Sequence, residues 1–197
     1  MVSVFPSQRG NGDAHDSGDA HQPVREPRSL PGLQPHVLAQ PQGLLQVNTA
    51  PFRGSFGGVL SHAIRSAGMG CRVMVSQFLR GGVNQGPDHA VRLCGGLEWM
   101  RPALVGSLHG PSNDPEARAA VQELWATSRT RLMAGSMELM VLDELGLAVQ
   151  YGLIDEAEAV TALEQRSSRT DLILTGPSMP ASFVAMADQV TELRHSR

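Results

Sequence analysis

Short apolar runs alternate with segments of helical periodicity from residue 43 onward, and no other feature of the sequence limits the fold as strongly. Where strands and helices alternate along a chain, the strands form a mostly parallel sheet and the helices cover both of its faces. We therefore predict a three-layer α/β domain. The predicted strands span residues 43–49, 71–78, 96–99, 137–142, 171–175 and 189–193, and the predicted helices span residues 59–67, 115–134, 156–165 and 181–187.

Residues at the predicted helix ends support this assignment. Asp114 and Asp155 are good N-cap residues, and Pro115 suits a first helical turn. In a sheet of this kind, ligands bind at the carboxyl ends of the strands. Those ends lie at residues 49–54, 77–81, 143–144 and 175–178.

Residues 1–42 differ in composition from the rest of the chain. They are rich in Pro, Gln, Gly, Asp and His, and they lack hydrophobic periodicity. Such a segment cannot bury enough apolar surface to offset the conformational entropy that it loses on ordering. We predict a disordered tail over residues 1–42 and one folded domain over residues 43–197.

The charged residues argue against several functions. The net charge of −3 gives no sign of binding to a nucleic-acid backbone. All 16 basic residues are arginine, so the chain has no lysine that could form a Schiff base or reach a phosphate. Arginine pairs with phosphate, but its planar fork does not replace the compact ammonium of a phosphate-binding loop.

The sequence carries no sign of membrane insertion or export. No apolar run reaches the ~20 residues that a membrane-spanning helix needs. The N-terminus lacks the basic and then apolar pattern of a signal peptide, and Cys71 and Cys94 show neither a metal-binding spacing nor a disulfide framework. We therefore expect a cytoplasmic protein that does not bind a membrane.

The first strand–turn–helix is the place where a P-loop, G-x-x-x-x-G-K-[ST], would hold the phosphates of a nucleotide. The stretch there reads APFRGSF, in which Pro51 removes a backbone donor, Ser55 replaces the Lys and Phe56 replaces the metal-binding hydroxyl. It is either a weak anion site at a helix N-terminus or a turn kept for folding alone. The residues that would make such a vestigial nucleotide site are Thr49, Arg53, Gly54, Ser55 and Gly57.

A second candidate site follows the apolar strand at residues 137–142, which ends in Asp143 and Glu144. An acid at the end of a buried strand is typical of the Walker B position, where it holds Mg²⁺ directly or through water. The alternative is that Asp143 caps the following helix.

These stretches resemble the ATP:corrinoid adenosyltransferases of the P-loop type, over residues 43–194. The clearest part is MELMVLDELGLAVQYGLIDEAEAVTALEQRSSRTDLILTG at residues 137–176, with a strand ending in LDE, a Tyr-containing helix and a strand ending in TG. VMVSQFLRGG at residues 73–82 is similar to the family's second strand, and ADQVTELR at residues 187–194 to its last strand. The resemblance implies a P-loop NTPase-like, RecA-like fold.

The resemblance also implies ATP, Mg²⁺ and a corrinoid as ligands, with transfer of the 5′-deoxyadenosyl group of ATP to Co(I) and release of triphosphate. The family's loop GNGKGKTTA falls on APFRGSFGG at residues 50–58, so the essential Lys meets Ser55 and the metal-holding Thr meets Phe56. Arg53 meets the first family Lys, and Glu144 matches the family's metal-binding acid.

Other positions depart from the family pattern. The family's corrinoid-facing Phe-x-Trp pair has no equivalent at residues 105–108, and Trp99 stands a few positions early. Pro177 replaces the Arg of the family's TGR loop. Each lost charged hydrogen bond removes about 1.5–3 kcal/mol of binding free energy, so the loss of Lys, Thr and Arg together weakens triphosphate binding by orders of magnitude.

From these departures we predict a catalytically degenerate homologue with no assigned cofactor. It would act as a binding, regulatory or assembly protein, through a protein partner or a small molecule in a remodelled cleft. One alternative is an active cob(I)alamin adenosyltransferase that uses Arg53 and Glu144. Another is a structural subunit that pairs with an active paralogue, and the family resemblance implies a homodimer.

Overall fold

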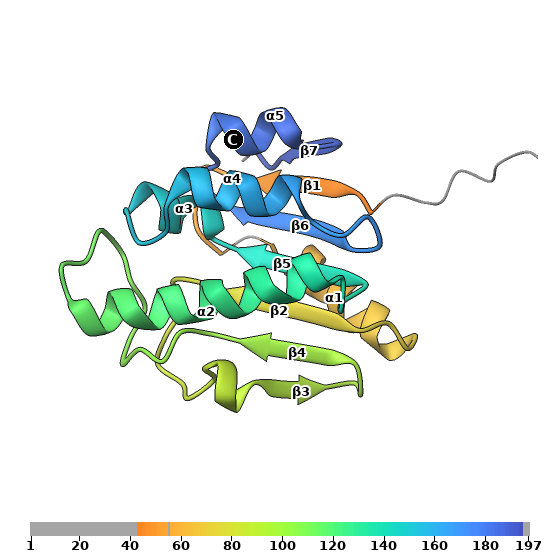
Figure 1. Cartoon of the computed structure of the whole chain (residues 1–197), viewed down its shortest axis with the longest axis horizontal. Helices are drawn as coiled ribbons and strands as arrows, with labels where there is room; N and C mark the ends of the chain where they lie inside the picture. Colours follow the sequence, from red (N-terminus) through yellow and green to blue (C-terminus); the bar gives the residue numbers. More distant parts are fainter. Residues whose placement is uncertain (1–42, 55, 195–197) are drawn as a thin grey trace, which may run out of the picture. The chain divides into compact units, whose positions relative to one another are not determined.

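The computed structural model describes residues 43–54 and 56–194 (Figure 1). The predicted tail at residues 1–42 lies outside the described residues. Seven strands form one sheet in the order β3-β4-β2-β5-β6-β1-β7. The strands are β1 (Leu45–Thr49), β2 (Val73–Gln77), β3 (Val91–Leu93), β4 (Leu97–Met100), β5 (Leu139–Asp143), β6 (Asp171–Gly176) and β7 (Gln189–Glu192).

The sheet is mostly parallel, as the alternation of strands and helices predicts. Every neighbouring pair is parallel except β3 and β4, which are antiparallel. The helices are α1 (Gly57–Gly68), α2 (Pro115–Ala134), α3 (Leu145–Gln150), α4 (Glu156–Glu164) and α5 (Ala181–Met186), with a short 3₁₀ turn at Pro87–His89.

Helices cover both faces of the sheet, because successive residues of each buried strand point to opposite sides. In β5, Met140 packs in the larger core with α2 and α4, whereas Val141 packs in a second core with Ala63 and Ala67 of α1. In Figure 1, α2 and α4 cross the near face of the sheet. The prediction of a three-layer α/β arrangement is therefore confirmed.

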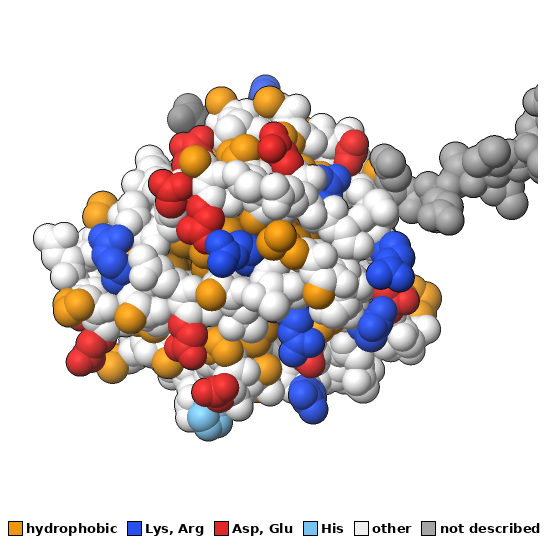
Figure 2. Space-filling model, viewed as in Figure 1, with side chains coloured by type: hydrophobic (Ala, Val, Ile, Leu, Met, Phe, Trp, Pro, Cys, Tyr) orange, Lys and Arg blue, Asp and Glu red, His pale blue; other side chains and the backbone are white. Residues whose placement is uncertain are grey.

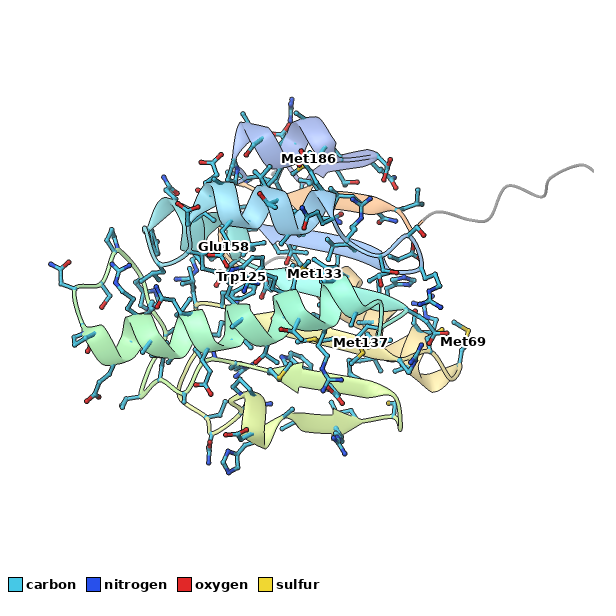
Figure 3. All side chains as sticks on the ribbon, viewed as in Figure 1. Met69, Trp125, Met133, Met137, Glu158 and Met186 are labelled. Atoms are coloured by element: carbon cyan, nitrogen blue, oxygen red, sulfur yellow. The ribbon has the colours of Figure 1, made fainter. Side chains whose placement is uncertain are left out.

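Helix α2 packs against α4 through a polar contact at the rim of the larger core. The indole Nε1 of Trp125 donates a 3.1 Å hydrogen bond to Oε1 of Glu158 (Figure 3), and Arg129 forms an ion pair with the same carboxylate. Figure 2 shows acidic and basic side chains interspersed over this face, in keeping with the small net charge.

The helix caps agree with the sequence. The Asp114 carboxylate accepts a hydrogen bond from the Glu116 amide at 3.0 Å, and the Asp155 carboxylate accepts one from the Glu158 amide at 2.8 Å. Side-chain oxygens thus satisfy amide groups that the first turn leaves without partners.

The periodicity of the sequence did not predict two elements, β3 and α3. Strand β3 has three residues, all of them exposed, and is too short to give a periodic signal. Helix α3 has six residues and begins directly after β5, so an apolar run continues from strand into helix without a break. The family resemblance, but not the periodicity, implied a helix there. Within the described part of the chain, no helix is both long and apolar enough to cross a membrane.

Candidate functional site

Three polar side chains form a row across the carboxyl ends of neighbouring strands. Gln77 of β2 stands beside Asp143 of β5, and Asp143 stands beside Thr175 of β6. Gln77 Nε2 donates to Asp143 Oδ2 at 2.8 Å, and Thr175 Oγ1 donates to Asp143 Oδ1 at 2.7 Å. This row therefore joins three of the four strand ends at which the sequence predicts a site.

The Asp143 carboxylate is almost fully enclosed, with 8% of its side chain exposed. Burial raises the pKa of Asp143 above its ordinary value, and the hydrogen bonds from Thr175 and Gln77 oppose that rise. The guanidinium of Arg80 lies 3.7 Å away. The N-cap position of α3 is occupied by Glu144 and carries no side-chain cap hydrogen bond, so the interpretation of Asp143 as a cap for the next helix is wrong.

Glu144 occupies the first position after β5 in a left-handed backbone conformation with φ of 64°. Non-glycine residues adopt this conformation at a cost of about 1–2 kcal/mol. It lets the buried Glu144 side chain face the turn after β1, where Arg53 Nε and Nη2 each donate a 2.6 Å hydrogen bond to one carboxylate oxygen. The Glu144 side chain is 2% exposed and that of Arg53 is 25% exposed.

Arg53 also holds a second loop in place. Its Nη1 donates a 2.6 Å hydrogen bond to the carbonyl oxygen of Leu108, and it lies 3.3 Å from Nδ1 of His109. The hydrogen bonds to Glu144 raise the pKa of Arg53 further, so this guanidinium stays charged. Arg53 therefore makes hydrogen bonds to protein groups on two sides, and its assignment to a weak anion site stays a prediction.

The segment from β1 to α1 folds as a strand, a turn and a helix, as the sequence predicts. Thr49 pairs with Gly176 at the end of β6, Gly54 has φ of 96°, and α1 begins at Gly57. Phe56 precedes the helix without a side-chain cap, and its ring is buried. Ser55 lies outside the described residues.

A cavity of about 230 Å³ opens between α1 and the strand ends. Its apolar lining includes Phe56, Val59, Leu60, Trp99 and Val141. Its polar lining consists of Gln77, Arg80, Arg101, Asp143 and Thr175.

A chain of hydrogen bonds fixes one wall of this cavity. Gln77 Oε1 accepts from Trp99 Nε1 at 2.9 Å and from Arg101 Nε at 2.8 Å. The Arg101 guanidinium lies 5.9 Å from the centroid of the Trp99 ring. Sequence reasoning missed Arg101, which lies in no motif. Its position two residues after the predicted strand at residues 96–99 was the available signal.

The acidic residues do not gather into a metal centre. Among residues 43–54 and 56–194, no group of three or more His, Cys, Asp or Glu side chains could hold a metal ion together. The two acids at the end of β5 instead face different neighbours, Asp143 the cavity and Glu144 the guanidinium of Arg53.

Comparison with known proteins gives a consistent result. The family model for ATP:corrinoid adenosyltransferase BtuR/CobO/CobP matches residues 41–197. The corrinoid adenosyltransferase of Escherichia coli K12 is 29% identical over 153 residues, which cover 78% of this chain and 77% of that protein. Corrinoid adenosyltransferase CobA of Salmonella typhimurium is 28% identical over the same shares of both chains, and the Pseudomonas aeruginosa protein is 23% identical over 77% of this chain and 75% of its own.

Proposed function

Because this chain belongs to the ATP:corrinoid adenosyltransferase family, we propose that it is a non-catalytic member of that family. It keeps the P-loop NTPase-like sheet and works as a binding, regulatory or assembly protein. Its partner would be another protein or a small molecule, and a homodimer is part of the proposal. A cytoplasmic location remains a prediction from the sequence.

The ion pair between Arg53 and Glu144 is the observation that carries the proposal. An acid at this position in P-loop proteins holds Mg²⁺. Here a guanidinium neutralises it through two hydrogen bonds of 2.6 Å. A divalent ion that approached Glu144 would first have to displace Arg53, whose guanidinium would then lose both hydrogen bonds to the carboxylate.

The remaining donors do not fit a magnesium-bound triphosphate either. Both Asp143 oxygens accept hydrogen bonds from Gln77 and Thr175. The sequence has no lysine, and Phe56 occupies the position of the metal-binding hydroxyl. A nucleotide at this turn would therefore lack the lysine and the metal ligands that hold the phosphates in P-loop proteins.

The direct test is an adenosylation assay with ATP, Mg²⁺, a chemical reductant and a corrinoid. The active Escherichia coli relative serves as the positive control for the reduced corrinoid. We expect no Co–C bond formation above the protein-free rate, read from the corrinoid absorption spectrum. Turnover that disappears in Glu144→Ala would instead establish the alternative, an active adenosyltransferase with a remodelled site.

A further inference from the structure

We propose that the cavity beside α1 binds a small organic monoanion, one carboxylate on an apolar body about the size of a single ring. This inference rests on the proposed function, because it assigns a new ligand to a site that no longer holds a nucleotide. The site consists of two guanidiniums, a hydrogen-bonded polar wall and an apolar floor, and each of these points to the same ligand class.

The charges that line the cavity do not balance. Arg80 and Arg101 both line it, and Asp143 is the one carboxylate among the described residues that line it. Burial and the repulsion of Arg80 lower the pKa of Arg101, whereas burial raises that of Asp143. Arg53 does not add to this charge because Glu144 neutralises it. Two positive guanidiniums and one carboxylate leave a net positive charge, which one further negative charge would balance.

The free hydrogen-bonding groups of the cavity wall indicate that a bound anion would contact the guanidiniums. The Gln77 amide and both Asp143 oxygens already have hydrogen-bond partners within the protein. Arg80 Nε lies 3.7 Å from Asp143 Oδ2, beyond hydrogen-bond distance, and it is buried without a hydrogen-bond acceptor among the described residues. Unused N–H groups of arginine donate hydrogen bonds to a carboxylate in a fork geometry.

The apolar floor and the volume set the size of the ligand. The rings of Phe56 and Trp99 and the side chains of Val59, Leu60 and Val141 line the cavity. A cavity of about 150 Å³ holds one benzene ring, and sites for drug-sized molecules measure about 300–1,000 Å³. At about 230 Å³, this cavity has room for one ring with a carboxylate.

Calorimetric titration of the full-length protein tests the proposal with four probes: benzoate, cyclohexanecarboxylate, the neutral isostere benzamide and inorganic phosphate. We expect both carboxylates to bind with millimolar or better affinity, and benzamide and phosphate to bind at least tenfold more weakly. If benzamide bound as tightly as benzoate, the arginine charges would not contribute to binding. If phosphate bound more tightly than benzoate, the apolar floor would not contribute to binding. Either result overturns the proposal.

Variants locate the bound anion. Arg80→Gln and Arg101→Gln should each weaken benzoate binding at least tenfold, because each removes a charged hydrogen bond. Arg65→Gln is the matched control, since Arg65 is exposed on α1 and does not line the cavity. Circular dichroism shows whether each variant is folded. If one of them unfolds, quenching of Trp99 fluorescence by benzoate in a Trp125→Phe background reports binding in the wild-type cavity. No quenching there overturns the proposal.

The same titrations separate this inference from the proposed function. Absence of benzoate binding, together with absence of adenosylation, contradicts only the ligand assignment. Adenosylation by the wild-type protein contradicts the proposed function itself, whatever the result with benzoate.

Discussion

The guanidinium of Arg53 donates two parallel hydrogen bonds of 2.6 Å to the carboxylate of Glu144, although the two residues are 91 positions apart in the sequence. They meet because β1 and β5 both pair with β6, so the segments that follow these strands emerge at one edge of the sheet. The positive charge that neutralises Glu144, the acid after β5, thus comes from Arg53 of the same chain.

Replacing Arg53 should destabilise the protein, because it leaves the enclosed Glu144 carboxylate without its counter-ion. Removing one partner of a fully buried pair costs about 3–5 kcal/mol. Since the Arg53 side chain is 25% exposed, we expect Arg53→Ala to lower the free energy of unfolding by about 2 kcal/mol. Urea denaturation measures this change.

The matched control for Arg53 is Arg92, whose side chain is 78% exposed and whose nitrogen lies 3.8 Å from Glu98. Arg92→Ala should change the free energy of unfolding by less than about 0.5 kcal/mol. Equal effects of the two substitutions would mean that the Arg53–Glu144 pair contributes no more than a surface pair.

The buried carboxylate of Asp143 should make stability fall as the pH rises through its titration. Its pKa is raised in the folded state and is about 3.9 in the unfolded chain. Between these two pKa values the folded protein binds more protons, so the free energy of unfolding decreases with increasing pH. This contribution is present in full below about pH 3.9 and is lost above the raised pKa.

Asp143→Asn removes this titration while other carboxylates remain in both proteins. We expect the stability of the wild type relative to Asp143→Asn to fall with increasing pH across the window and to stay level above it. Chemical denaturation at a series of acidic pH values gives the comparison. A relative stability that rises with pH would show that the hydrogen bonds from Thr175 and Gln77 outweigh burial.

Two helical glycines should respond oppositely to alanine. A Cβ on Gly146 in α3 would lie 2.2 Å from the carbonyl oxygen of Ser178, whereas one on Gly58 in α1 would meet nothing within 4 Å. We expect Gly146→Ala to cost about 1–3 kcal/mol by overpacking and Gly58→Ala to add about 0.5–1 kcal/mol through helix propensity. Thermal unfolding of the two variants checks both signs, and a stabilised Gly146→Ala would contradict the packing of α3 on the loop after β6.

The sequence predicts the fold well where elements are long or strongly periodic. The strand around Val141 and the helix that Asp114 caps are both confirmed within a few residues. The antiparallel edge strand β3 could not be predicted, because three exposed residues are too few to give a periodic pattern.

The candidate site also has a part that the sequence predicts and a part that it does not. Sequence reasoning placed Asp143 and Glu144 at a strand end, and the register of a parallel sheet brings that end beside Gln77 and Thr175. It did not predict the pairing of Arg53 with Glu144. This contact depends on the left-handed conformation of Glu144, for which a glutamate gives no local signal. The assignment of these residues to nucleotide or metal binding stays a prediction.

Calorimetric titration of the purified protein with ATP and Mg²⁺ tests the central claim, that the chain no longer holds a nucleotide triphosphate. We expect no heat of binding up to millimolar ATP, with the corrinoid adenosyltransferase of Escherichia coli K12 as the positive control. Micromolar binding of ATP that depends on Mg²⁺ would contradict this claim. It would mean that Glu144 binds the metal ion in place of Arg53.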